Sequence, residues 1–422
     1  MRVAIIGAGV TGLGAALALS ARADRNVTLY EREPRLGGHA HTIEVDYDGR
    51  RVAVDTGFIV YNELNYPLLT GMLEWLGAPT VVSDMSFALS CGDGAFEWCG
   101  RHHAPLGGLF AQKRNALDPR FLAFLNEVRR FQIRARADVA AGAFGEETLG
   151  AYLAARGFSA RLRDDYVAPM GAAIWSMTPG ETLDFPARAF FAFFDNHKLL
   201  QWDRPVWRTL RGGSREYVAR LRERLRADTV TSEDAVALRR EGDEVVVRTA
   251  QGREARFDAV ITATHAPTAL RLLTDATEAE TRALSPFRVS ANRVVVHRDP
   301  SLMPRRRAAW ASWSVLRRDR GARPAVTYWM NRLQAIPDDL PLFVTLNPDR
   351  PIRSDLTFAE FAYDHPLYDA AAFGAQARLG QAQGVGRVWF AGAWTGYGFH
   401  EDGLRSGIEA ARALGGEAPW LR

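Results

Sequence analysis

The chain has 422 residues, of which 47% are hydrophobic and 24% charged, with a formal net charge of +4. These values exclude a disordered or low-complexity chain, and the length predicts two lobes rather than one core. The positive charge comes almost entirely from arginine. It fits either an anionic partner surface or an arginine-rich composition as such, and we expect no nucleic-acid partner.

The residues at the start of the chain predict a βαβ unit. Residues 2–7 (RVAIIG) form an apolar, β-branched run typical of a buried parallel strand. An apolar helix follows to about Ala21, and a second strand (VTLYE) ends at Glu31. The link between the two strands is long enough for a helical crossover and therefore predicts a parallel pair.

Along the rest of the chain, segments typical of a nucleotide-binding domain alternate with helical and strand segments of a different kind. We expect a hairpin turning at Asp48-Gly49, a helix over 65–77, helices through 118–197, three strands in 235–262, strands near 290–298, 309–316, 325–331 and 341–346, a last strand at 387–392 and a helix from about Asp402 to Leu414. This order predicts a discontinuous cofactor domain (1–60, 205–285 and 385–422) and a substrate domain in two pieces (61–204 and 286–384).

The two cysteines and the first residues of the chain bear on the cellular compartment in which the protein is expected. Cys91 and Cys99 flank a Gly-Asp-Gly turn, where a cross-strand disulfide is one interpretation and two buried thiols the other. Met1 leads straight into the first strand, and no apolar run is long enough to cross a bilayer. We therefore expect a cytoplasmic protein in a reducing environment.

The first glycine-rich stretch, GAGVTG, predicts a dinucleotide site because it follows a strand and opens a helix. Gly7 permits the turn, Gly9 lets backbone approach a diphosphate, and Gly12 packs the helix on the strand. Val10 and Thr11 place their amides at the helix N-terminus, where anions bind. Glu31 follows 19 residues after Gly12 and can accept hydrogen bonds from a ribose.

The next residues distinguish the cofactor. Arg32 beside Glu31 suggests the 2′-phosphate of NADP, but Arg35 and the pair Gly37-Gly38 follow (EREPRLGGHAHT). This segment resembles the E-x(n)-R-x-G-G signature of the amine oxidase, phytoene desaturase and protoporphyrinogen oxidase flavoproteins. The resemblance implies non-covalent FAD, a Rossmann-like α/β cofactor domain of the GR2 type and an amine oxidase-like α+β substrate domain. It also implies further cofactor contacts at His39, where the family usually has Arg or Lys, and at Thr56, Gly57 and Val236.

No second G-x-G-x-x-G occurs, so we expect electrons to enter the flavin from substrate. In the same superfamily the closing segment returns to the flavin as a strand ending in A-G-E and a helix starting near E-G-A-x-x-S-G. Here Gly392, Asp402 as expected N-cap, Gly403, Leu404 and Ser406 match, but Ala393 replaces the acid.

The loop TGYGFHEDG, with 169–176 and 193–197, is similar to a narrower bacterial group. That group is associated with cyclopropane fatty acid synthase, a lipid methyltransferase, and includes desaturases of methyl-branched acyl chains. The resemblance implies a fatty acyl or phospholipid substrate and contact with such a methyltransferase. An amine oxidase on a small amine, and a flavin-binding accessory subunit without turnover, are the alternatives.

Several residues bear on the chemistry. In amine oxidases a lysine lies where this chain has Asn292, and Phe399 falls at one aromatic cage position. Phe190, Phe193, Phe194 and His197 recur at helical spacing, which fits either the wall of an acyl tunnel or core packing. If a substrate carbon loses hydride to the flavin, a base must remove a proton from the neighbouring carbon. His400 is the first candidate for this base and His197 the second, although His400 could instead be structural.

Two remaining patterns concern metals and membranes. The pairs His39/His41 and His102/His103 lack a carboxylate or cysteine at ligand spacing, so we expect no metal. Residues 305–323 interleave arginine and tryptophan, as interfacial segments do, but also alternate like an edge strand. The first interpretation predicts peripheral contact with the inner face of the cell membrane.

Overall fold

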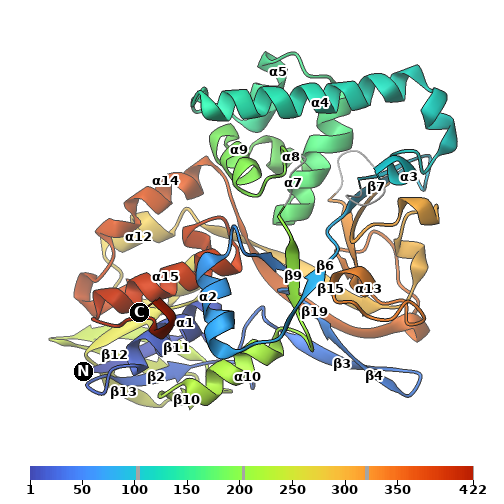
Figure 1. Cartoon of the computed structure of the whole chain (residues 1–422). Coiled ribbons are helices and arrows are strands. Elements are labelled where there is room, and N and C mark those ends of the chain that lie inside the picture. The colour runs from blue at the N-terminus through green and yellow to red at the C-terminus, as the bar shows by residue number, and fades with distance from the viewer. Residues whose placement is uncertain (101–104, 202–204, 319–322, 422) are drawn as a thin grey trace.

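The structure, a computed structural model, describes residues 1–100, 105–201, 205–318 and 323–421. A five-stranded sheet has the order β10-β2-β1-β14-β20, and all its pairs are parallel. The bounds are β1 Arg2–Ile6, β2 Asn26–Tyr30, β10 Asp228–Val230, β14 Ala259–Thr262 and β20 Val388–Phe390. Segments from the start, middle and end of the chain thus meet in one sheet, as the sequence predicts (Figure 1).

Helices cover one face of this sheet. They are α1 (Val10–Ser20), α2 (Pro67–Leu76), α10 (Arg215–Arg224) and α15 (His400–Ala413). The closest pair is α1 and α15, since a Cβ on Gly407 would lie 2.1 Å from the carbonyl oxygen of Thr11. The packing of α2 here differs from the predicted boundary at residue 61, which assigned it to the substrate domain.

The other face carries a three-stranded antiparallel sheet and three helices. They are β11 (Ala235–Glu241), β12 (Glu244–Thr249), β13 (Glu254–Phe257), α11 (Ala266–Leu272), α12 (Glu278–Leu284) and α14 (Ala370–Arg378). The predicted boundary at residue 385 had left α14 in the substrate domain. The three strands expected in 235–262 are four, because the run breaks at Asp258 and β14 joins the parallel sheet.

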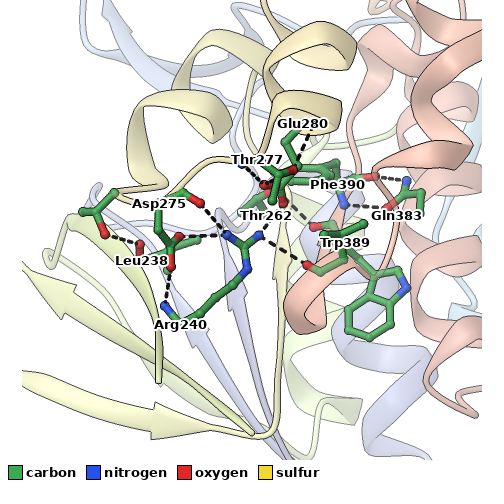
Figure 2. Close-up of polar contacts among 11 residues, drawn as sticks. Leu238, Arg240, Thr262, Asp275, Thr277, Glu280, Gln383, Trp389 and Phe390 are labelled. Atoms are coloured by element: carbon green, nitrogen blue, oxygen red, sulfur yellow. Dashed lines mark hydrogen bonds and ion pairs between the residues drawn. The ribbon is translucent and has the colours of Figure 1, made fainter. Parts of the chain in front are cut away.

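Arg240 on β11 connects these elements (Figure 2). Its guanidinium donates to the carboxylate of Asp275 at 2.8 Å, to that of Glu280 on α12, and to the carbonyl of Val385 at 3.3 Å. The Glu280 side chain is fully buried, so Arg240 compensates a charge that has no access to water.

The second lobe contains a seven-stranded mixed sheet in the order β19-β15-β18-β17-β16-β7-β8. The bounds are β7 Phe87–Cys91, β8 Phe96–Gly100, β15 Arg288–His297, β16 Trp313–Arg317, β17 Ala325–Trp329, β18 Phe343–Leu346 and β19 Thr357–Leu367. Smaller units are the hairpin β3 (Thr42–Tyr47) and β4 (Arg50–Asp55), and the sheet of β5 (Tyr61–Asn62), β9 (Trp207–Leu210) and β6 (Thr80–Ser83).

Helices form a separate layer on this lobe, at the top of Figure 1. Their bounds are α4 Pro119–Ala140, α5 Leu149–Ala155, α6 Ala160–Leu162, α7 Ala168–Trp175, α8 Pro179–Leu183 and α9 Ala187–Asn196, whereas α3 (Pro105–Leu109) lies beside β8 and α13 (Met330–Leu333) on the sheet. In the described ranges no helix has the length and apolar character needed to cross a bilayer.

Two sequence-based interpretations can now be compared with the structure. Cys91 and Cys99 lie on the predicted hairpin but pair with Phe96 and Ala88, so they do not face each other and form no disulfide together. In 305–323, Trp310 is buried and Trp313 half-buried in β16, an internal strand. In the described residues 305–318 the structure contradicts both the interfacial and the edge-strand interpretations, because the tryptophans pack inward and β16 has a neighbour on each side.

Candidate active site

One cavity of about 1480 Å³ extends from the carboxyl edge of the parallel sheet into the second lobe. Residues one or two positions after β1, β2, β14 and β20 line it, as expected where ligands bind to parallel sheets. Sites for one small ligand occupy roughly 300–1,000 Å³. The volume is therefore large enough for a dinucleotide and a second molecule.

The first glycine-rich turn is built as a phosphate cradle. A Cβ on Gly7, whose φ is +99°, would lie 2.7 Å from the carbonyl oxygen of Ala263, and one on Gly12 would lie 1.8 Å from that of Gly7. A Cβ on Gly9 would meet nothing within 4 Å. Gly7 and Gly12 thus serve backbone packing, whereas Gly9 borders open space at the uncapped N-terminus of α1, which fits a diphosphate.

The acid and the arginine that follow are positioned by backbone groups. One carboxylate oxygen of Glu31 accepts from the amide of Ala8 at 2.8 Å, and the other from that of Glu33 at 2.9 Å. A carboxylate has about four acceptor positions, so capacity for ribose hydroxyls remains. Arg35 donates to the carbonyl of Gly38 at 2.9 Å, which holds the double glycine against the fingerprint turn.

Most predicted cofactor residues line the cavity. They are Gly7, Gly9, Val10, Thr11, Glu31, Arg32, Arg35, Gly37, Gly38, His39, Thr56, Gly57, Val236, Gly392 and Ala393. Five others do not, and each has a structural reason. Gly12, Gly403 and Leu404 pack α1 against neighbouring backbone or against α15, and Ser406 accepts from the amide of Gly392 at 2.9 Å.

Asp402 is the fifth, and its predicted role as N-cap was wrong by three residues. The N-cap of α15 is Phe399. The Asp402 carboxylate accepts from the amides of Phe399 and Tyr397, both at 3.1 Å, and so fixes the loop that enters the cavity. Asp402 therefore shapes the cavity through this loop and does not line it.

The catalytic candidates all reach the cavity but differ in their surroundings. The ring of His400 stacks on Phe58, and its Nε2 lies 3.2 Å from the hydroxyl of Tyr217. Burial lowers the pKa of His400 to about 3. His400 therefore contacts side chains rather than the backbone of its own loop, and its Nε2 is already engaged.

His197 follows the end of α9 and stacks on Phe193 with ring centroids 3.9 Å apart; the ring of Phe399 lies 5.8 Å away. Nδ1 lies 3.1 Å from the carbonyl of Phe193, which makes Nδ1 the protonated nitrogen and leaves Nε2 a lone pair. Among the described residues Nε2 has no hydrogen-bond partner. Burial lowers the pKa of His197 to about 4.

The four residues at helical spacing in 190–197 support both the tunnel-wall and the core-packing interpretation, each in part. Phe193 and His197 line the cavity, whereas Phe190 and Phe194 pack in the core behind it. Asn292, at the expected lysine position, is buried and its amide donates to the carbonyl of Ser290 at 2.8 Å. It does not line this cavity.

A wall of histidines was not predicted as a unit. The ring of His39 lies 5.1 Å from Tyr363, 5.7 Å from His365 and 6.2 Å from His265. The Tyr363 hydroxyl in turn lies 2.6 Å from Nδ1 of His41. Burial lowers the pKa of each of these histidines, to about 4 for His365 and His41, so the wall is uncharged at neutral pH.

Sequence signals for this wall are weak. His265 lies three residues after the end of β14 and could have been found from its place near a strand end, but β19, which carries Tyr363 and His365, was not predicted. In the described part of the chain no group of three or more His, Cys, Asp or Glu side chains is arranged to hold a metal ion. His102 and His103 lie outside the described residues.

These features agree with the comparison to known families. Residues 10–301 match the family described as flavin containing amine oxidoreductase. The chain belongs to this family. Its cofactor is FAD. The residues present fit FAD, since Glu31 would accept from the adenosine ribose, the N-terminus of α1 would hold the diphosphate and the closing loop would face the flavin.

Solved structures share the fold of this flavin-containing amine oxidoreductase. They include a CLA-producing fatty acid isomerase from P. acnes (16% identity, TM-score 0.67, 98% of each chain covered) and a putrescine oxidase (16%, 0.68, 98% and 99%). A cyclohexylamine oxidase from Brevibacterium oxydans is similar (18%, 0.68, 98% of each chain). At these identities the likeness concerns the fold alone. No curated protein matches the chain.

Proposed function

We propose that the protein is an FAD-dependent oxidoreductase that desaturates a fatty acyl chain, with a methyl-branched phospholipid chain as the expected substrate. The observation that carries the proposal is the apolar lining of the cavity in the second lobe. Its residues include Met85, Phe87, Met170, Ala173, Ile174, Trp175, Phe193, Leu199, Val294, Trp313, Val344 and Leu346.

Carboxylates that line the cavity lie elsewhere. Glu31, Glu33, Glu233 and Asp234 surround the adenosine end, and Glu360 and Asp364 are exposed on the outer face of β19. An alkylammonium ion buried among apolar and uncharged side chains would lose hydration without a counter-ion, which is costly. An acyl chain needs no counter-ion. The uncharged histidines of the wall likewise favour an acyl chain over an alkylammonium ion.

Bound FAD would accept a hydride from a substrate C–H, and a proton must leave the neighbouring carbon for the double bond to form. The surroundings of His197 favour it over His400 as proton acceptor, because its Nε2 is unprotonated and unengaged. A basic pKa is not required, because loss of hydride from a branched carbon makes the adjacent C–H strongly acidic.

The second candidate is an amine oxidase, which membership of the family favours. Anaerobic mixing of the holoprotein with a lipid extract, and separately with a panel of amines, distinguishes them by bleaching of the flavin. Bleaching by lipid supports the proposal, and bleaching by amines alone overturns it.

Failure of both would favour the accessory subunit, for which contact with a lipid methyltransferase is the corresponding proposal. A cytoplasmic location with peripheral membrane contact likewise stays a proposal.

A further inference from the structure

The outer face of α4 is unlike the other surfaces of the second lobe. This helix is the long one at the top of Figure 1, and its inner face packs through Phe121, Phe124, Phe131 and Ala135. Its other face bears no described element over Leu122 and Ile133, whose side chains are 45% and 56% exposed. Leu117, just before the helix, is 88% exposed.

The arrangement of side chains on this face follows the helical repeat. Leu122, Asn126, Ile133 and Ala137 are spaced by four, seven and four residues and form one exposed stripe. Arg129 and Arg136 project from one side of the stripe, and Arg130 from the other. All three arginines are exposed, and among the described residues none has an ion-pair or hydrogen-bond partner.

Acidic groups of α4 are turned away from the stripe. Asp138 is buried and accepts from Tyr152 at 3.0 Å and from Arg134 and Arg156 at 2.9 and 3.0 Å. Glu127 is half-buried and accepts from the amide of Ser159 at 2.7 Å. Neither acid therefore lies on the outer face of α4, which carries the exposed Arg129, Arg130 and Arg136 beside the apolar Leu122, Ile133 and Ala137 and the polar Asn126.

We infer that this face docks the protein on an anionic phospholipid bilayer. A stripe of apolar residues flanked on both sides by arginines is the pattern of helices that lie in the plane of a membrane interface. The arginine stems can cover the apolar boundary while the guanidinium groups reach lipid phosphates. A nucleic acid would satisfy the charges but leave Leu122 and Ile133 exposed, and the stripe has no aromatic ring on which a base could stack.

This surface replaces the one expected from the sequence. Trp310 in 305–323 is buried with Met303, Trp329 and Phe343, so that segment presents no aromatic anchor. The docking inference rests on α4 alone and does not depend on the proposed reaction.

The test is co-sedimentation of the FAD-loaded protein with vesicles, read from flavin absorbance. Phosphatidylcholine vesicles are compared with an equal mixture of phosphatidylcholine and phosphatidylglycerol. We expect binding to the mixed vesicles only, and weaker binding when salt is raised from about 50 to about 500 mM. Since no substrate is turned over, failure of the proposed reaction leaves this readout unaffected.

Charge-matched variants locate the surface. Arg129→Glu/Arg130→Glu should lower the partition by more than about tenfold, given the usual contribution of each arginine at an anionic surface. Arg226→Glu/Arg412→Glu changes the net charge equally at exposed positions of the other lobe and should leave the partition unchanged. Ile133→Asp should lower the partition at both salt concentrations, because it removes an apolar contact.

Four outcomes would overturn the inference. They are no binding of the wild-type protein to mixed vesicles, wild-type partition of the Arg129→Glu/Arg130→Glu variant, equal loss in the Arg226→Glu/Arg412→Glu variant, and binding of an RNA probe through the same arginines without vesicle binding. Unchanged flavin absorbance in each variant shows that the fold is intact.

Discussion

The imidazole of His400 stacks on the ring of Phe58, with centroids 3.7 Å apart and planes 15° from parallel. Together with the Tyr217 hydroxyl at 3.2 Å, this contact holds the first residue of α15 against the cavity. Burial lowers the pKa of His400 to about 3, so the ring is neutral at any pH at which the protein would work. Because a neutral imidazole can still accept a proton, the difference from His197 is that Nε2 of His400 is engaged with Tyr217, and on this ground we expect His400 to act as an aromatic wall residue.

His400→Phe should retain bound flavin and reduce activity by less than about fivefold, since loss of a positioned acid or base typically costs 10²–10⁴-fold. Phenylalanine keeps the stacking on Phe58 and gives up only the contact with Tyr217. The measurement is the rate of anaerobic flavin reduction by the substrate that bleaches the wild-type protein. A hundredfold loss with a normal flavin spectrum would restore His400 as the proton acceptor.

His197→Gln should slow flavin reduction by about 10²–10⁴-fold without changing the flavin spectrum. Glutamine keeps polarity and size but cannot accept the proton. Since the pKa of His197 lies at about 4, the wild-type rate should rise as pH increases through that value and be flat above it. His400→Phe is the matched control, being a histidine change in the same cavity, and equal rates in both variants would contradict the assignment.

Gly9→Ala should weaken FAD binding by more than about tenfold, because the added methyl would occupy the space next to the diphosphate. The protein itself should tolerate the change, since a Cβ there meets no atom within 4 Å. Titration of the apoprotein with FAD measures the first effect and thermal unfolding of the apoprotein the second. Gly380→Ala, where a Cβ also meets nothing, is the control and should bind FAD normally.

Asp55 should make stability depend on pH. It is fully buried and accepts from Ser214, Thr42 and Gln334; burial raises its pKa from 3.8 to about 6. Because the folded state holds the proton more tightly, this stabilisation is complete below pH 3.8 and is lost as pH rises through 6. The loss amounts to about 3 kcal/mol in the free energy of unfolding.

Asp55→Asn cannot ionise and should not show this decline. Urea unfolding of both proteins between about pH 4 and pH 7.5 measures the difference in the free energy of unfolding at each pH. The variant should gain on the wild-type protein as pH rises. Parallel curves across this range would show that Asp55 does not titrate there.

Arg240→Ala should destabilise the protein by about 3 kcal/mol, because it leaves the carboxylate of Glu280 buried without its partner. The side chain of Arg240 is 16% exposed and that of Glu280 is 0% exposed. Thermal unfolding provides the measurement. Arg239→Ala removes an exposed neighbour on the same strand and should change stability by less than about 0.5 kcal/mol. Equal effects would contradict the role of the buried pair.

The sequence predicted the cofactor lobe well because its signals are local. The glycines after β1, the acid after β2 and the double glycine each report a backbone requirement within a few residues, and all of them except Gly12 line the cavity. The strand β19 was missed because it is an edge strand with a proline at 366 and a mixed pattern of Phe, Ala and Asp. Because β19 was missed, Tyr363 and His365 were also missed as residues near His39, from which they are more than 300 positions away in the sequence.

The sequence by itself predicted a dinucleotide site at the first turn, because the fingerprint glycines and Glu31 act through neighbouring backbone groups. It also placed the closing glycine-rich segment beside the same site. Only the tertiary structure decided which histidine has a free nitrogen, since the partners Tyr217 and Phe58 of His400 are distant in the chain. It likewise decided that Trp310 is buried and that Leu122 and Ile133 are exposed. Burial depends on packing between elements, which residue spacing within one element does not reveal.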